Sequence, residues 1–310
     1  MQGKRIIVTG GAGFIGSHLV SSLVKSDNEV IVVDTLLRGN KLPKEVLAKI
    51  EFHKLDVCDS SRMIELAKGV DIIFHFAAIL GVDIVADNPI ETMETEVNGM
   101  QSVARAAIEN GVSKIVYAST SGVYGHLALE KSVDEQILVD PRTSYAMAKR
   151  YNEIYLASLF EEKGINSIAL RFFNVYGLRQ DNRMVVPRFI EQARSNKPIT
   201  VYGTGEQTRD FTYVDDAIHA TLLLAQNING FEIFNVANEK EATIGHLAEL
   251  IKTMTQSASP VEYIDAPKKR YDYEVGRRFG SSEKLMKHVN YKPSTRLEDG
   301  LEILCKDSIN

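Results

Sequence analysis

The stretch Arg5-Ile-Ile-Val-Thr-Gly-Gly-Ala-Gly-Phe-Ile-Gly16 decides the fold, because it joins a short apolar run to a glycine-rich turn. Residues 5–9 are typical of a buried parallel strand. Residues 17–25 follow with apolar side chains at helical spacing, so the order is strand, glycine loop and helix. The glycines permit a tight turn and a close backbone approach, and the helix N-terminus favours an anion. The segment therefore predicts a site for the diphosphate of a dinucleotide.

A second apolar run, Val30-Ile-Val-Val-Asp34, ends in an acid. Asp34 follows Gly16 at roughly the 20-residue distance at which a carboxylate meets the adenosine ribose hydroxyls. A carboxylate there repels a 2′-phosphate, so NAD is expected rather than NADP. Arg38 is close enough in sequence to leave NADP open as an alternative.

Strand-like runs alternate with helical stretches up to residue 172. This alternation predicts the α/β class, with a Rossmann-type, doubly wound parallel sheet covered on both faces. The further strands expected are residues 51–55, 71–76, 114–119 and 167–172, and the further helices are residues 60–68, 94–110 and 144–163. Later runs are shorter and mixed with loops. We therefore predict an NAD-binding domain over residues 1–178 and a smaller, irregular, mainly substrate-binding domain over residues 179–310, with residues 210–238 returning to the first domain.

The composition, 310 residues with 44% hydrophobic and 25% charged, is ordinary for a globular protein. A formal charge of −5 gives no reason to expect nucleic acid or an anionic membrane surface as a partner. No apolar run approaches the roughly 20 residues that span a bilayer, and no signal peptide is recognisable. Cys58 and Cys305 form neither a disulfide framework nor a metal-binding pattern. We expect a cytoplasmic protein without a metal.

Tyr145 and Lys149 lie one helical turn apart in Ser144-Tyr-Ala-Met-Ala-Lys149. A phenol has a pKa of roughly 10, and lowering it by about three units needs roughly 4 kcal/mol. One ammonium about 4 Å away supplies that much at an effective dielectric constant of about 20. We therefore expect Lys149 to lower the pKa of Tyr145 and to make it a base beside the cofactor. An ordinary surface pair is the alternative for this motif taken alone.

Together these segments resemble the extended short-chain dehydrogenase/reductase family, specifically its nucleotide-sugar epimerases and dehydratases such as the UDP-glucose 4-epimerases. The resemblance covers nearly the whole chain and rests on residues 9–16, 56–57, 74–78, 119–125, 145–149, 171–177 and 201–211. It implies NAD as cofactor and a nucleoside-diphosphate sugar, most simply a UDP-sugar, as substrate. It also implies a homodimer that pairs through helices 94–110 and 144–163. The second helix carries apolar residues for that contact, which a core against the sheet could equally bury: Met147, Ile154, Tyr155 and Leu159.

The resemblance further implies roles for individual residues. The cofactor contacts are Gly10, Gly13, Phe14, Ile15 and Gly16 at the pyrophosphate, Asp34 at the ribose, Asp56 and Val57 at the adenine, and Ala77, Ala78 and Phe172 along its length. The catalytic set is Tyr145 as base, Lys149 as its partner and nicotinamide-ribose ligand, and Thr120 as the hydroxyl that binds the reacting sugar. Ser119 and Ser121 flank Thr120 and remain alternatives for that role. The substrate contacts are Asn174, Arg209 and Arg270 at the diphosphate and Thr200 and Tyr202 at the nucleotide base.

The chain departs from the family pattern at two positions, so the contacts that the family makes there are not transferred to this sequence. Glu96 stands where the family usually has Asn near the cofactor, and Gly280-Ser281 replaces an Ala-Asp pair close to the substrate.

The resemblance implies a shared first step in which Tyr145 takes a sugar hydroxyl proton while a hydride passes to NAD⁺. Dehydratases of the family have Asp-Glu where this chain has Ser121-Gly122, and UDP-glucuronate decarboxylases have Glu at the position of Gly122. The simplest remaining outcome is return of the hydride to the other face of the ketone, which gives a 4-epimer. Net oxidation at C4, decarboxylation and dehydration stay open. Arg179 could reach a uronate carboxylate, but it decides little because relatives with neutral sugars also carry an Arg there. A non-catalytic dinucleotide-binding module is the other class of alternative, although such proteins usually lose the Tyr or the Lys.

Overall fold

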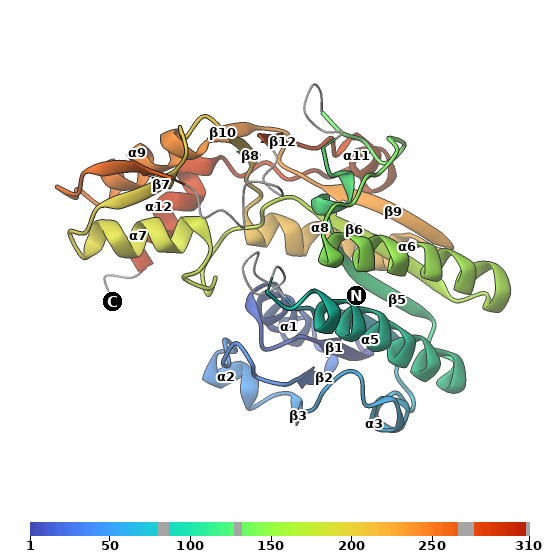
Figure 1. The fold of residues 1–310 in the computed structure, drawn as a ribbon. Coiled ribbons are helices and arrows are strands. Elements are labelled where there is room, and N and C mark those ends of the chain that lie inside the picture. The colour runs from blue at the N-terminus through green and yellow to red at the C-terminus, as the bar shows by residue number, and fades with distance from the viewer. Residues whose placement is uncertain (80–86, 127–131, 266–275, 308–310) are drawn as a thin grey trace.

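The computed structural model describes residues 1–79, 87–126, 132–265 and 276–307 (Figure 1). A seven-stranded sheet lies at its centre, in the order β3-β2-β1-β4-β5-β6-β9, and every neighbouring pair is parallel. The strands are β1 (Arg5–Thr9), β2 (Glu29–Asp34), β3 (Glu51–Lys54), β4 (Ile72–His75), β5 (Lys114–Thr120), β6 (Asn166–Phe172) and β9 (Phe231–Val236). The order runs outward from β1 in both directions, which confirms the Rossmann-type, doubly wound sheet.

The central strands are apolar throughout because both faces of the sheet are covered. Ile6 and Val8 of β1 point into one core, and Ile7 between them points into the other. All three are fully buried. Successive side chains of a strand alternate between faces, so this continuous apolar run needs helices on both sides.

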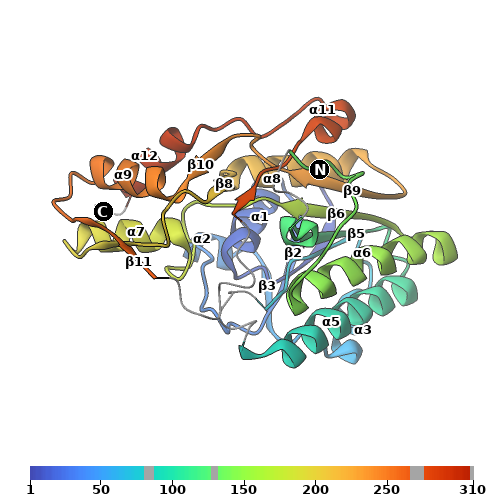
Figure 2. The same cartoon turned by 45° about the horizontal axis from the view of Figure 1, so that its top comes forward.

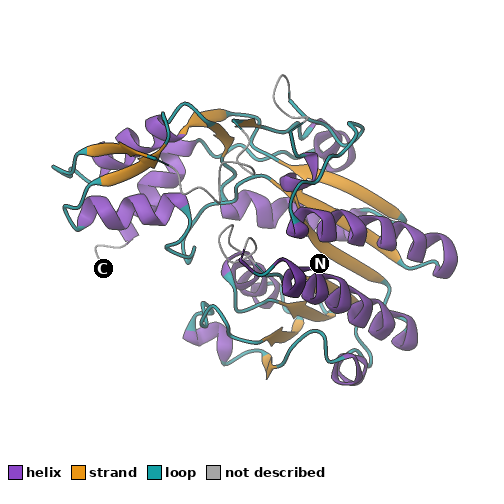
Figure 3. Ribbon diagram, in the orientation of Figure 1, coloured by secondary structure: helices purple, strands orange, loops and turns teal. Residues whose placement is uncertain are grey.

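Those helices form two layers, and Figure 3 shows them on either side of the sheet. One layer holds α1 (Phe14–Lys25) and α8 (Val214–Asn227), which pack against each other. The other holds α3 (Ser60–Leu66), α5 (Pro89–Asn110) and α6 (Ser144–Lys163). The helix α5 begins at Pro89 rather than at residue 94, since proline is well accommodated in the first turn.

The smaller C-terminal part is built from short elements. Strand β7 (Ile199–Tyr202) pairs with β11 (Val261–Ile264), and β8 (Thr208–Asp210) lies between β10 (Glu241–Thr243) and β12 (Arg277–Arg278). The remaining helices are α2 (Lys44–Leu47), α7 (Val185–Arg194), α9 (Ile244–Met254), α11 (Glu283–Val289) and α12 (Leu297–Asp307). Within the described segments, no helix combines the length and apolarity needed to cross a bilayer.

Candidate active site

The glycine loop between β1 and α1 is shaped so that side chains are excluded from it. Gly10 has φ +68°, and a Cβ on it would lie 2.6 Å from the backbone nitrogen of Ala77. A Cβ on Gly16 would lie 2.1 Å from the carbonyl oxygen of Gly10. No side chain caps the N-terminus of α1 at Gly13, so its first backbone N–H groups are available to an anion. The loop therefore fits the diphosphate that the sequence predicts.

Asp34 lies at the carboxyl end of β2, directly beside this loop. Its carboxylate accepts hydrogen bonds from the backbone N–H of Ala12 at 3.0 Å and of Leu36 at 2.8 Å. Burial raises the pKa of Asp34, and the two backbone donors counteract that rise. Arg38, the residue that left NADP open, lies 3.8 Å from Asp181. The positive charge of Arg38 is therefore partly balanced by Asp181.

The other predicted cofactor contacts gather at the same ends of the strands. Ala77 and Ala78 follow β4 and are half-buried, and Phe172 closes β6 with its ring 6.0 Å from that of Phe76. Val57 is buried in the core under α5, whereas Asp56 is exposed beside it. Phe14 and Ile15, which open α1, are half-buried.

Thr120 ends β5 and caps the short 3-10 helix η1 (Ser121–Tyr124) that follows it. Its Oγ1 accepts a hydrogen bond from the backbone N–H of Gly122 at 3.0 Å. Ser119 is buried and donates to Glu153 at 2.7 Å, and Ser121 is also buried. Thr120 is therefore the most accessible of the three neighbouring hydroxyls. A Cβ at Gly122 would lie 3.3 Å from Thr120 Oγ1, so residue 122 lies beside this hydroxyl.

Tyr145 and Lys149 occupy the first turns of α6. The helix begins here because Thr143 caps it, with Oγ1 accepting from the backbone N–H of Ala146 at 3.1 Å. Lys149 Nζ lies 5.3 Å from the centre of the Tyr145 ring and 4.7 Å from that of Tyr117. The ammonium is therefore beneath the phenol, at the spacing that the sequence indicates.

The expected effect of Lys149 on Tyr145 is nevertheless wrong. Lys149 Nζ lies 3.0 Å from Glu96 Oε2 on α5, and both side chains are buried. Burial first, and then the negative charge of Glu96, raise the pKa of Tyr145 above its ordinary value. The sequence spacing shows the ammonium of Lys149 beside Tyr145 but not the carboxylate of Glu96 that faces it.

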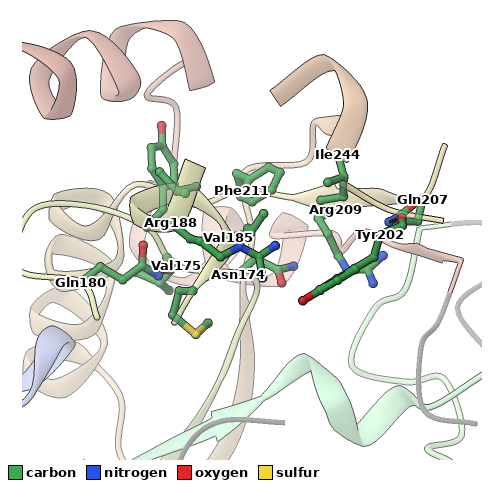
Figure 4. A pocket seen from close by; sticks show the side chains of 13 residues that line it. Asn174, Val175, Gln180, Val185, Arg188, Tyr202, Gln207, Arg209, Phe211 and Ile244 are labelled. Carbon is green, nitrogen blue, oxygen red and sulfur yellow. Dashed lines mark hydrogen bonds between the residues drawn. The ribbon is translucent and has the colours of Figure 1, made fainter. Parts of the chain in front are cut away.

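A second group of predicted residues lines a pocket in the C-terminal part (Figure 4). Asn174, Tyr202 and Arg209 come from three separate segments and meet there. Arg209 donates to the carbonyl oxygen of Thr208 at 2.8 Å, and Asn174 donates to that of Asp210 at 3.3 Å. Both polar side chains are thus held at the pocket by neighbouring backbone.

Two predicted substrate residues are not part of this pocket. Thr200 is half-buried and exchanges hydrogen bonds with Gln192 of α7 at 2.8 and 3.1 Å. It therefore supports β7 and does not line the pocket. Arg270 lies outside the described residues.

The pocket also holds residues that the sequence did not single out. Arg188 of α7 lies with its guanidinium carbon 5.0 Å from the centre of the Tyr202 ring, and Gln207 and Gln180 are further polar lining residues. Gln207 stands two positions before Arg209, inside a segment already marked by the resemblance, so it could have been found. Arg188 gave no such signal, because it looks like an ordinary charged position on an amphipathic helix.

Two further observations concern possible metal ligands and the buried His75. Across the described ranges, no group of three or more His, Cys, Asp and Glu side chains is arranged to hold a metal ion. His75, at the end of β4, is buried with Nδ1 2.8 Å from Thr9 Oγ1, and burial lowers its pKa to about 3. His75 is therefore a neutral core residue.

Comparison with known proteins gives a consistent result. The family model described as the NAD dependent epimerase/dehydratase family matches residues 6–237. A UDP-N-acetyl-alpha-D-glucosaminuronate decarboxylase of Bacillus cytotoxicus is 36% identical over 311 residues, covering 96% of both proteins. The crystal structure of the UDP-glucose 4-epimerase of Thermotoga maritima with UDP-glucose superposes with a TM-score of 0.92 at 30% identity, covering 99% of this chain and 100% of that one. The UDP-glucose 4-epimerase of Thermus thermophilus in complex with NAD gives a TM-score of 0.88 at 29% identity, with 97% of each chain covered.

Proposed function

The chain belongs to the NAD dependent epimerase/dehydratase family, and we propose that it is a nucleotide-sugar 4-epimerase that acts through a transient 4-keto sugar. NAD is the cofactor, and the glycine loop and Asp34 fit it. One observation supports the finer assignment. Thr120 and Tyr145 are accompanied at residues 121 and 122 by Ser and Gly, which supply no carboxyl group.

The first half of the reaction uses Thr120 and Tyr145. Thr120 binds the C4 hydroxyl and Tyr145 takes its proton, and bound NAD⁺ would supply the acceptor for the C4 hydride. Lys149 lies beneath the phenol and donates toward the nicotinamide ribose. Asn174 and Arg209 hold the diphosphate, so that the sugar alone can turn.

The second half of the reaction follows from the lack of a carboxyl group at residues 121 and 122, beside Thr120. Loss of water from C5 and C6 needs an acid and a base, and neither Ser121 nor Gly122 can transfer a proton as a carboxyl would at neutral pH. The 4-keto sugar therefore rotates, and the hydride returns to its opposite face. Tyr145 gives the proton back to the C4 oxygen and so completes the inversion, while return of the hydride would leave the cofactor oxidised again.

Decarboxylation of a uronate sugar is the second candidate, because a decarboxylase is 36% identical to this chain. Two observations count against it. Gly122 provides no carboxyl beside Thr120. Arg179, a candidate for binding the uronate carboxylate, donates to Ser17 O at 3.1 Å and to Ser21 Oγ at 3.2 Å on α1. Its guanidinium is therefore directed to that helix.

Turnover of a mixture of C4-deuterated and unlabelled nucleotide sugars tests the proposal. UDP-sugars are the first choice, followed by dTDP-, GDP- and CDP-sugars, without added reductant. Deuterium retained at C4 of an inverted product, within the same molecule, is the expected result by mass spectrometry and NMR. A pentose, a 6-deoxy product, or stoichiometric NADH with a free 4-keto sugar would overturn it in favour of the corresponding alternative.

We further propose that the enzyme is a homodimer that pairs through α5 and α6, which lie side by side in Figures 1 and 2. Met147, Tyr151 and Ile154 are 46%, 43% and 55% exposed along α6. Of the other residues expected at this contact, Leu159 belongs to the core beneath the helix and is 5% exposed, and Tyr155 is partly buried against the same core. The exposed apolar side chains of α6 support its part in the contact.

A further inference from the structure

The ion pair between Glu96 and Lys149 is the least expected feature of the active site. It joins α5 to α6 at 3.0 Å, and the exposed fractions of the two side chains are 0% and 1%. A buried charge is costly unless an opposite charge meets it, so each group requires the other. The pair lies directly below Tyr145, the predicted base.

Glu96 is held in place by more than its charge. Its Oε1 accepts a hydrogen bond from the backbone N–H of Ile79 at 3.1 Å, in the segment that follows the predicted cofactor contacts after β4. Its backbone carbonyl accepts from Asn152 Nδ2 of α6 at 3.0 Å. Glu96 Oε2 and Lys149 Nζ form no further hydrogen bond of ordinary geometry with described residues. The Lys149 ammonium therefore keeps N–H donors for a ribose hydroxyl, while the Glu96 carboxylate balances its charge.

We propose that Glu96 is a positioning residue that acts through Lys149, cancelling the ammonium charge beside Tyr145 so that this phenol keeps its proton until oxidised cofactor is bound. The proposal rests on the assigned role of Tyr145 in the proposed function. It makes the positive charge of the oxidised nicotinamide the decisive influence on Tyr145. Beside a reduced cofactor, which would carry no ring charge, Tyr145 would hold the proton until it returns to the C4 oxygen. The proton count balances, since one proton leaves the sugar hydroxyl and the same one returns.

Other titratable groups around the pair do not replace Glu96. Tyr117 of β5 is fully buried, and burial, followed by the charge of Glu96, raises its pKa well above the ordinary value. Burial first, and then Asp56, raise the pKa of Cys58 to about 12, and burial lowers that of His75 to about 3. All three are therefore neutral near pH 7. Glu153, one turn beyond Lys149 on α6, is neutralised by Arg171 at 2.8 Å.

The sign of the effect follows from these charges. A negative group near a phenol favours the protonated form, so Glu96 raises the pKa of Tyr145. Glu96→Gln removes the charge and keeps an oxygen that can accept from Ile79 and from Lys149. Tyr145 should then ionise about one to two pH units lower in the NAD-bound protein, because one partly screened charge near a phenol has an effect of that size.

Ultraviolet titration of tyrosinate measures this shift without any sugar substrate. The chain has 12 tyrosines, so each protein is compared with its own Tyr145→Phe counterpart and the difference isolates Tyr145. The matched control is Glu94→Gln, since Glu94 is exposed on the same helix and should leave the titration unchanged. Ionisation of Tyr145 in E96Q at the same or a higher pH than in the native protein would overturn the proposal.

A double variant tests the cancellation itself and avoids an unpaired buried charge. In E96Q/K149M both charges are absent, so Tyr145 should ionise within about half a pH unit of its native value if the two cancel. Ionisation more than about one unit higher would mean that Lys149 outweighs Glu96, and would refute the proposal.

The turnover profile gives a second readout. With the substrate that the sugar screen identifies, the acidic limb of kcat for E96Q should move to lower pH by the same amount as the titration. A protein that fails that screen still gives the tyrosinate result, so failure of the proposed reaction and failure of this inference are separable.

Discussion

Replacing Glu153 with Gln should destabilise the folded protein by about 3 to 5 kcal/mol. The carboxylate is fully buried in α6, and its two oxygens bind the Nε and Nη2 atoms of Arg171 at 2.9 and 2.8 Å. Ser119 donates to the same carboxylate at 2.7 Å. This cluster joins β5, β6 and α6 immediately behind Thr120.

The size of this destabilisation follows from the acceptor oxygen and the negative charge that Gln lacks. An amide keeps one acceptor oxygen but turns an NH₂ group toward a guanidinium that has only donors. Arg171 is 1% exposed, so water cannot replace the lost partner. Burial lowers the pKa of Arg171, but the hydrogen bonds and charge of Glu153 outweigh burial and leave the pKa raised. Arg171 therefore stays charged, and the variant holds an unpaired buried cation.

Urea unfolding followed by circular dichroism measures the change from the midpoint and the slope. The matched control is Glu162→Gln on the same helix, where the carboxylate is exposed and accepts a hydrogen bond from Ser158 at 2.8 Å. That control should stay within about 0.5 kcal/mol of the native protein. A loss below about 1 kcal/mol for E153Q would refute the reasoning that an unpaired Arg171 charge is costly in this cluster.

Three further outcomes are expected. Tyr145→Phe should lower turnover by about 10²- to 10⁴-fold with NAD affinity retained in calorimetry, and near-native turnover would remove Tyr145 from the mechanism. Asp34 should make the native protein bind NAD more tightly than NADP, and Asp34→Asn should reduce this difference in affinity. Equal affinities for NAD and NADP in the native protein would contradict this role of Asp34. Ile154→Lys should convert a dimer into a monomer in light scattering at micromolar concentration, because it places a charge on the exposed stripe of α6. A variant that stays dimeric would locate the interface elsewhere.

The local patterns of the sequence predicted the sheet well, because each signal lies within a few residues. The apolar run before the glycines and the acid that ends β2 both act through neighbours in the chain. The family and the cofactor were confirmed as well, since the motifs that carry them are short and contiguous.

The electrostatics of the site could not be predicted in the same way. Glu96 and Lys149 are far apart in sequence and meet only because α5 packs on α6. The sequence marked Glu96 as unusual but gave no means of knowing which group it would face. The pKa of Tyr145 depends on that contact and on burial, and both are properties of the assembled structure.

The pocket in the C-terminal part shows the same limit. Tyr202 and Arg209 were found through a contiguous segment, while Arg188 enters the pocket from α7 and belongs to no motif that the sequence shows. Thr200 was included because it belongs to the same short stretch as Tyr202, yet its hydroxyl accepts a hydrogen bond from Gln192 of α7. The alternation of side chains along β7 does not show that Thr200 is hydrogen-bonded to Gln192.

The position of β9 at the edge of the large sheet has a consequence for how the molecule can be divided. The chain leaves the sheet after β6, builds α7, β7 and β8, returns through α8 and β9, and then leaves again. A fragment that stopped near residue 178 would lose the strand that pairs with residues 167–172 and the helix that packs on α1. Its last strand would become a bare, apolar edge, which invites aggregation. Limited proteolysis in the loops of the C-terminal part should therefore yield nicked chains that remain associated.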